Sequence, residues 1–78
     1  MLTAAQIRAA RAMLNWSGPQ LAVEASLSLP TIRRMESELG PGRSTVDNVN
    51  AVKRACERAG IIFIYEDTTG GPGVRLKS

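Results

Sequence analysis

Apolar residues recur at intervals of three and four through residues 1–60, which is the spacing of amphipathic helices. The first such segment carries Ile7, Ala10, Met13 and Leu14. Thr3 precedes it, and Gln6 lies three residues further on, so the two form a capping box that starts a helix. The pattern therefore predicts a first helix of about three turns, from Thr3 to the pair Asn15-Trp16.

Two short helices are expected next, separated by the turn Ser26-Leu27-Ser28. Ser17 starts the first of them, and Gln20 completes a second capping box. Residues 29 to about 37 form the second, which ends before the Gly-Pro-Gly of residues 40–42. Each has a proline in its first turn, where the missing N–H does no harm. Six apolar residues can line the seam between the two helices: Leu21, Ala22, Ala25, Leu27, Ile32 and Met35.

A fourth helix is predicted to open at Ser44, with Asp47 in its first turn, and to close at Gly60 through a left-handed cap. Its expected buried stripe is Val46, Val49, Val52, Cys56 and Ala59.

The pattern changes after Gly60. Residues 61–65 are β-branched or aromatic, residues 70–73 form a Gly-rich turn, and residues 74–77 alternate strictly, which predicts a β-hairpin. The first strand is apolar on both faces, so one face packs on the helices and the other needs a cover, for which a second subunit is the candidate. The sequence thus predicts a mainly α fold: a helical domain over residues 1–60 and a C-terminal hairpin, a candidate dimerisation element, over residues 61–78.

The positive charge lies in the helical part. The net charge is +3, and residues 1–60 hold eight Lys or Arg against five Asp or Glu, whereas residues 61–78 hold two of each. A chain of 78 residues forms one small core. The basic excess is compatible with nucleic acid as a partner.

Catalytic and metal-binding residue types are scarce. The chain has one cysteine, Cys56, and no histidine, so an internal disulfide, a thiolate zinc cluster and imidazole chemistry are excluded. We therefore expect no enzyme activity, no metal and no cofactor. The chain shows neither a leader pattern nor an apolar run of the ~20 residues that a membrane span needs, so a cytoplasmic protein without a membrane partner is expected.

The seam predicted above leaves residues 28–31 and Arg33-Arg34 outward. The helix expected over residues 29 to about 37 is capped, faces outward and is basic, which suits the major groove of DNA. As an isolated pair, the two arginines would be an ordinary solvated face, and a helix-turn-helix pattern also occurs as an ordinary helical corner.

Four pieces in order carry a family resemblance: Leu14-Asn15-Trp16-Ser17, Leu21-Ala22, Ser26-Leu27-Ser28 and Thr31-Ile32-Arg33-Arg34-Met35-Glu36. The last is similar to S-x-x-T-I-x-x-I-E-x-G of the lambda-repressor-like, or Xre/Cro-type, helix-turn-helix regulators of bacteria and phages. The resemblance covers roughly residues 3–60. It implies a four- to five-helix DNA-binding domain.

Carried over position by position, the resemblance places Leu29, Pro30 and Arg34 against base edges, with Ser28 and Thr31 near the backbone or the bases. Arg34 is the strongest candidate because a guanidinium can bridge O6 and N7 of guanine. Leu29 and Pro30 stand where amide side chains are frequent, which suggests reading of thymine methyl groups or of DNA shape.

The same resemblance assigns phosphate contacts to the amides of Ser17 and Gly18 and to Arg43, and it leaves Arg33 either at a phosphate or in solvent. It also implies a structural ion pair between Arg11 and Glu36. The family usually has Gln at the place of Gly18, and often Gly at the place of Ser26. A left-handed conformation at a residue other than glycine costs ~1 kcal/mol.

Two classes of function remain open. The first is a sequence-specific transcriptional regulator that binds a pseudo-palindromic operator on double-stranded DNA as a homodimer. The second is an antitoxin-like or antiactivator module that keeps the helix-turn-helix scaffold and binds a regulatory protein partner through residues 61–65 by edge pairing. We interpret Cys56 as a core residue and Trp16 as a plug between the first two helices.

Overall fold

A computed structural model describes residues 2–78, and for Arg43 only the backbone. It is mainly α-helical, with a two-stranded antiparallel sheet at the C-terminal end. The elements are α1 (Ala4–Leu14), α2 (Gly18–Ala25), α3 (Leu29–Met35), the 3-10 turn η1 (Pro41–Arg43), α4 (Val46–Arg58), β1 (Ile61–Ile64) and β2 (Gly73–Leu76). No helix among the described residues is both long and apolar enough to cross a bilayer.

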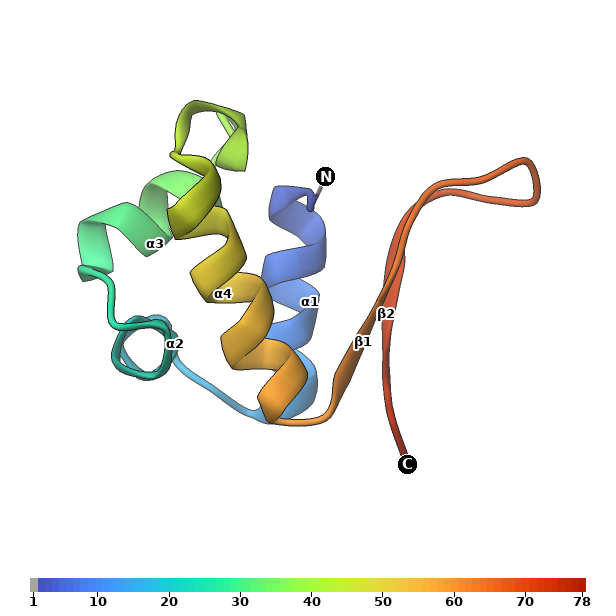
Figure 1. Cartoon of the computed structure of the whole chain (residues 1–78), viewed down its shortest axis with the longest axis horizontal. Helices are drawn as coiled ribbons and strands as arrows, with labels where there is room; N and C mark the ends of the chain where they lie inside the picture. The colour runs from blue at the N-terminus through green and yellow to red at the C-terminus, as the bar shows by residue number, and fades with distance from the viewer. Residues whose placement is uncertain (1) are drawn as a thin grey trace.

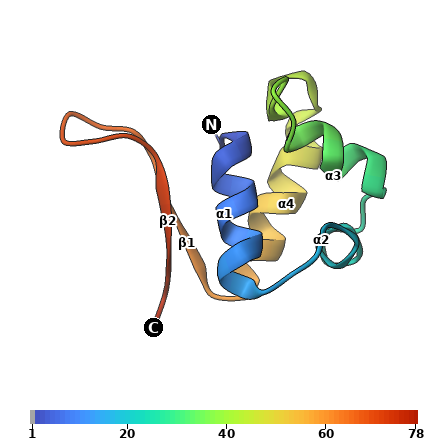
Figure 2. The same cartoon turned by 180° about the vertical axis from the view of Figure 1, so that it is seen from behind.

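The four helices form one body, and the hairpin stands beside it (Figure 1). The strands pack against α1 and α4, whereas α2 and α3 lie on the far side of α4 (Figures 1 and 2). The four α-helices and β1 contribute to a single apolar core, and Val74 of β2 packs against it. Its members are Leu2, Ile7, Ala10, Leu21, Ala22, Ala25, Ile32, Met35, Val49, Val52, Ala55, Cys56, Ile61 and Phe63.

The first three helices begin and end close to the predicted positions. Thr3 forms both hydrogen bonds of its capping box with Gln6, and α1 ends at Asn15 in the left-handed region at φ 58°. Met13 belongs to the predicted apolar repeat, yet it is exposed, while Leu14 packs against the core. Ser26 ends α2 at φ 57°, so this turn is left-handed without a glycine.

Helix α4 begins one residue later than predicted. Thr45 is the cap, and its hydroxyl accepts a hydrogen bond from the Asn48 amide at 3.1 Å; Ser44 is not the cap. Val46, expected on the buried stripe, is 69% exposed; it is the first residue of α4, directly after the cap. Ala59 is also exposed, since it is the C-terminal cap at which the helical period ends, while Ala55 is buried instead.

The predicted hairpin is confirmed. Its register pairs Ile61 with Leu76 and Phe63 with Val74. Side chains alternate between the faces of a strand, so Ile61 and Phe63 face the helices while Ile64 lies on the other face, 39% exposed. Gly60, at φ 104°, makes the turn from α4 into β1.

Gln6 ties the hairpin to α1. Its side-chain Oε1 accepts a hydrogen bond from the Thr3 amide at 2.9 Å, and its Nε2 donates to the carbonyls of Ile64 at 2.8 Å and Gly73 at 3.1 Å. Gln6 is the buried polar residue of the described core, at 2% exposure. The amide thus completes the helix cap and joins both strands at the end of their pairing.

Candidate nucleic-acid interface

Helices α2 and α3 form a corner around a closely packed seam. Five of the six residues predicted for this seam are buried, and Leu27 is partly buried against them. The chain turns at Ser26 and enters α3 through Ser28, whose hydroxyl accepts a hydrogen bond from the Thr31 amide at 3.3 Å. The hydroxyls of Ser28 and Thr31 also lie 2.8 Å apart, within hydrogen-bonding distance.

The outward side of α3 carries two arginines. Arg33 and Arg34 are exposed, as are Ser28 and Pro30, while Thr31 is half-buried. Neither arginine side chain forms an ion pair or hydrogen bond with another residue of the described part of the chain. Both guanidinium groups therefore keep their donors for an external acceptor.

Leu29 differs from its predicted outward position. It is half-buried and packs against the core. A Cβ atom added at Gly18 would lie 3.3 Å from Cδ1 of Leu29, so the glycine leaves the space that Leu29 uses. Gly18 and Leu29 therefore form one packing arrangement, in which a small residue at the start of α2 leaves room for the leucine at the start of α3.

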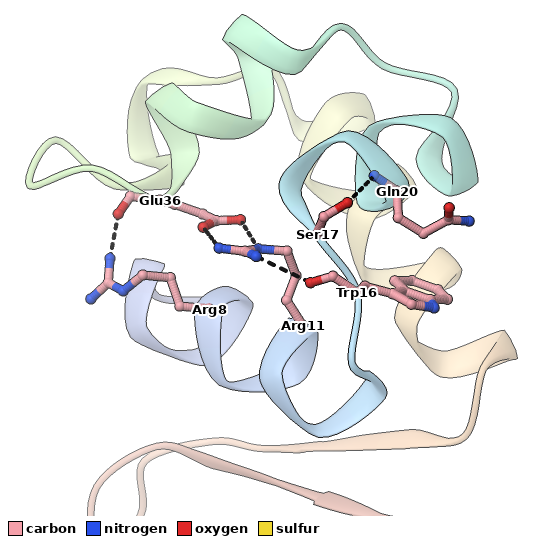
Figure 3. A network of polar contacts seen from close by, with 6 residues as sticks. All are labelled: Arg8, Arg11, Trp16, Ser17, Gln20 and Glu36. Carbon is pink, nitrogen blue, oxygen red and sulfur yellow. Dashed lines mark hydrogen bonds and ion pairs between the residues drawn. The ribbon is translucent and has the colours of Figure 1, made fainter.

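The start of α2 offers few free amide donors. The Ser17 hydroxyl accepts a hydrogen bond from the Gln20 amide at 3.1 Å, and Pro19 has no N–H. The capping box predicted here is only half formed, because the Gln20 side chain points away from Ser17 (Figure 3). It donates instead to Glu24 at 2.8 Å. The Gly18 amide remains as the first-turn N–H that the cap and the proline leave available to an anion.

A partly buried ion pair holds the C-terminal end of α3 against α1. Nε and Nη2 of Arg11 donate to the two carboxylate oxygens of Glu36 at 2.8 and 2.7 Å (Figure 3). Nη1 of Arg11 also donates to the Trp16 carbonyl at 3.2 Å. The hydrogen bond with Glu36 raises the pKa of Arg11 above its ordinary value. The ion pair that the resemblance implied is thus confirmed.

Two further arginines secure this arrangement, and the sequence reasoning did not identify either. Arg8 donates from Nη1 to the Glu36 backbone carbonyl, at the end of α3. It lies three residues before Arg11 on the same face of α1, which is a signal that could have found it. Arg58 donates from α4 to the Glu24 carbonyl near the end of α2 at 3.2 Å, and no sequence pattern indicates that contact.

Arg43 is in η1, which follows α3 and precedes α4. Its side chain lies outside the described part, so its predicted phosphate contact stays a prediction. Cys56 is fully buried, as predicted, and Trp16 packs against the edge of the core between α1 and α2. In the described residues, no three side chains of the metal-ligating types come together.

Comparison of the chain with known protein families and with curated proteins finds no matching family model and no significantly similar protein.

Proposed function

We propose that this chain is a sequence-specific DNA-binding transcriptional regulator of the lambda-repressor-like type, which binds a pseudo-palindromic operator as a homodimer. The observation that carries the proposal is the α2–turn–α3 corner with an outward α3 whose arginines have no partner within the described chain. A short, rigidly held, basic helix is what major-groove recognition requires.

In this proposal Arg34 reads a base edge, with Pro30 beside it, one helical turn earlier. A bidentate arginine–guanine pair is worth ~1–3 kcal/mol of discrimination against other bases. Leu29 supports α3 through its packing on Gly18. Because it is half-buried, only its exposed apolar edge can contact the DNA. Ser28 and Thr31 contact the DNA near the point where α3 starts.

The phosphate contacts fix the orientation of the domain. Arg33, beside the base-reading Arg34 on an exposed helix face, meets the DNA backbone, and Arg43 meets it from the loop before α4. The Gly18 amide and the cap residue Ser17 approach a phosphate at the start of α2, where the helix dipole favours an anion. These contacts contribute affinity for any sequence, and that affinity falls with salt.

The hairpin supplies the homodimer contact in this account. Each of its strands has one unpaired edge in the described residues. β1 carries no charged residue, whereas β2 has Arg75 and is followed directly by Lys77. Pairing of two copies through β2 would bring like charges together, so antiparallel pairing through β1 is favoured. Such pairing would place the Ile64 side chains of the two copies on one continuous face of the joined sheet.

The test is selection from a random double-stranded DNA library with purified protein at about 150 mM salt, at which weak non-specific complexes are reduced. The proposal predicts an enriched inverted repeat whose half-sites lie about one helical turn, ~34 Å, apart. A bound pool without sequence enrichment would contradict it.

One observation favours a second candidate, a protein-interaction module. Ile64, Tyr65 and Leu76 of the hairpin are exposed apolar residues, so the free edge of β1 can also accept an extended segment of another protein. The variant Arg34→Ala separates the two functions. It should weaken operator preference by ~1–3 kcal/mol under the first and leave partner binding intact under the second.

A further inference from the structure

A cavity of about 270 Å³ lies on the side of α4 that faces the hairpin. It is lined by Leu2, Val46, Val49, Asn50, Lys53 and Tyr65. The four α4 residues are spaced as one helix face, Leu2 directly precedes the cap of α1, and Tyr65 directly follows β1. Three segments that are far apart in the sequence therefore build the cavity, and none of its residues belongs to the proposed DNA-contacting set.

One part of the cavity is apolar. Leu2 and Val49 are buried and form its inner wall, while Val46 forms an exposed apolar wall on the first turn of α4. The volume exceeds the ~150 Å³ of an apolar cavity that holds a benzene molecule. The cavity is open to solvent on the side of Val46, so it can take up a small apolar body and cover part of its surface.

The other part is cationic. Nζ of Lys53 lies 5.8 Å from the centroid of the Tyr65 ring, a cation–π distance that holds the ammonium group beside the cavity. Within the described residues Lys53 forms no ion pair, and no carboxylate lines the cavity. Asn50 and the Tyr65 hydroxyl add polar atoms that make no side-chain hydrogen bond in the described chain.

We propose that this cavity binds a small monocarboxylate with an apolar body. The body replaces water against Leu2 and Val49, and the carboxylate accepts hydrogen bonds from Lys53 and Asn50. A single ammonium group matches one negative charge, whereas no arginine fork suited to a phosphate lines the cavity. The bound molecule would join α4 to the start of the hairpin loop. The proposal does not depend on DNA binding.

The probe is hexanoate, added to the full-length chain while amide signals are followed by two-dimensional NMR. We expect saturable shifts confined to the signals of residues 2, 46–53 and 65, with a dissociation constant in the millimolar to upper micromolar range for so small a ligand. Hexanol and hexylammonium are the matched ligands without the negative charge, and they should bind at least ~5-fold more weakly.

The variant Lys53→Met keeps the length of the side chain and removes its charge. It should weaken hexanoate binding ~5- to 10-fold, whereas Lys77→Met, the same change at an exposed position near the C-terminus, should not alter it. Lys53 is only partly buried, so we expect the variant to fold. The thermal unfolding midpoint of each variant checks this. The proposal is overturned by the absence of saturable shifts, by shifts elsewhere, by equal binding of hexanol, or by equal effects of the two lysine variants.

Discussion

Gln6 is a single buried side chain that holds two parts of the molecule together. It uses its oxygen for the cap of α1 and its nitrogen for carbonyls of both strands. Replacement by leucine would leave the partly buried Thr3 amide without its acceptor and would remove the two hydrogen bonds that tie the hairpin to α1. A buried polar group without a partner costs about 1–3 kcal/mol.

We therefore expect Gln6→Leu to lower the free energy of unfolding by ~1–3 kcal/mol, as measured by urea denaturation. Gln20→Leu is the matched control. Gln20 also lies three residues after a capping serine or threonine, but it is exposed and bonds only to Glu24 through its side chain. Its replacement should change stability by less than ~0.5 kcal/mol. Equal losses in the two variants would contradict the role assigned to Gln6.

Cys56 gives stability a pH dependence at alkaline pH. Burial raises the pKa of its thiol from 9.0 to about 11, and the carboxylates of Glu57 and Glu36 add to the shift. The unfolded chain loses this proton at a lower pH than the folded chain. The contribution of the Cys56 thiol to the free energy of unfolding is therefore complete below pH 9 and is lost as the pH rises towards 11. The loss is at most ~1.4 kcal/mol per pH unit.

The measurement is urea unfolding of the wild type and of Cys56→Ala at about pH 8 and about pH 10. Cys56→Ala lacks the thiol, so the wild type should lose more stability than the variant between the two pH values. Equal losses would show that Cys56 does not titrate differently in the folded and unfolded chains.

The C-terminal end of α3 is held by α1. The side chains of Arg11 and Glu36 are only 25% and 10% exposed, and Arg8 reaches the carbonyl of the same glutamate. Removal of one partner leaves a poorly hydrated charge, which is strongly destabilising. The orientation of α3 therefore depends on residues that do not need to touch DNA.

A double-mutant cycle with Arg11→Met and Glu36→Gln should give a coupling energy of ~1–3 kcal/mol in urea unfolding. Glu38→Gln, an acid-to-amide change at an exposed residue two positions later, serves as the control paired with Arg11→Met and should show almost none. A coupling below ~0.5 kcal/mol between Arg11 and Glu36 would mean that the ion pair does not hold α3 in place.

Local signals predicted most elements. Caps at Thr3, Ser17 and Ser28 set the starts of three helices, and the hairpin followed from a change of period after Gly60. The predicted start of α4 was wrong by one residue. Ser44 and Thr45 are both good caps, and tertiary packing determines which of them is used. The partial burial of the Leu29 side chain also depends on packing, because Leu29 occupies the space beside Gly18.

The contacts that position the candidate interface were less accessible to sequence reasoning. The pair Arg11–Glu36 came from the family resemblance, since no spacing rule joins residues on different helices. The bonds from Gln6 to the strands span 58 and 67 positions, so no local pattern carries them. Arg33 and Arg34 were identified from sequence as outward residues, and they are exposed.

The arrangement of the molecule separates its two proposed contact surfaces. The outward side of α3 and the hairpin lie on opposite sides of α4 (Figure 1). A dimer formed through the hairpins would therefore leave the α3 of each copy accessible. This arrangement is compatible with a two-fold complex on an inverted repeat.

Ile64→Lys tests the dimer contact, because it introduces a charge on the uncovered face of β1. We expect the protein to sediment as a dimer and the variant as a monomer at the same concentration. Val23→Lys is the matched control, since Val23 is an exposed apolar residue of α2, on the far side of α4 from the hairpin. A monomeric wild type, or an unchanged mass for Ile64→Lys, would contradict dimerisation through β1.

The most direct measurement of the central claim is the ratio of affinities for a selected operator and for a shuffled duplex, by fluorescence anisotropy at about 150 mM salt. We expect Arg34→Ala to lower the binding free-energy difference that corresponds to this ratio by ~1–3 kcal/mol and to relax preference at one base pair. Lys77→Ala, which removes a charge near the C-terminus, should leave the ratio unchanged. If Arg34→Ala leaves both the affinity and the preference intact, α3 is not the recognition helix.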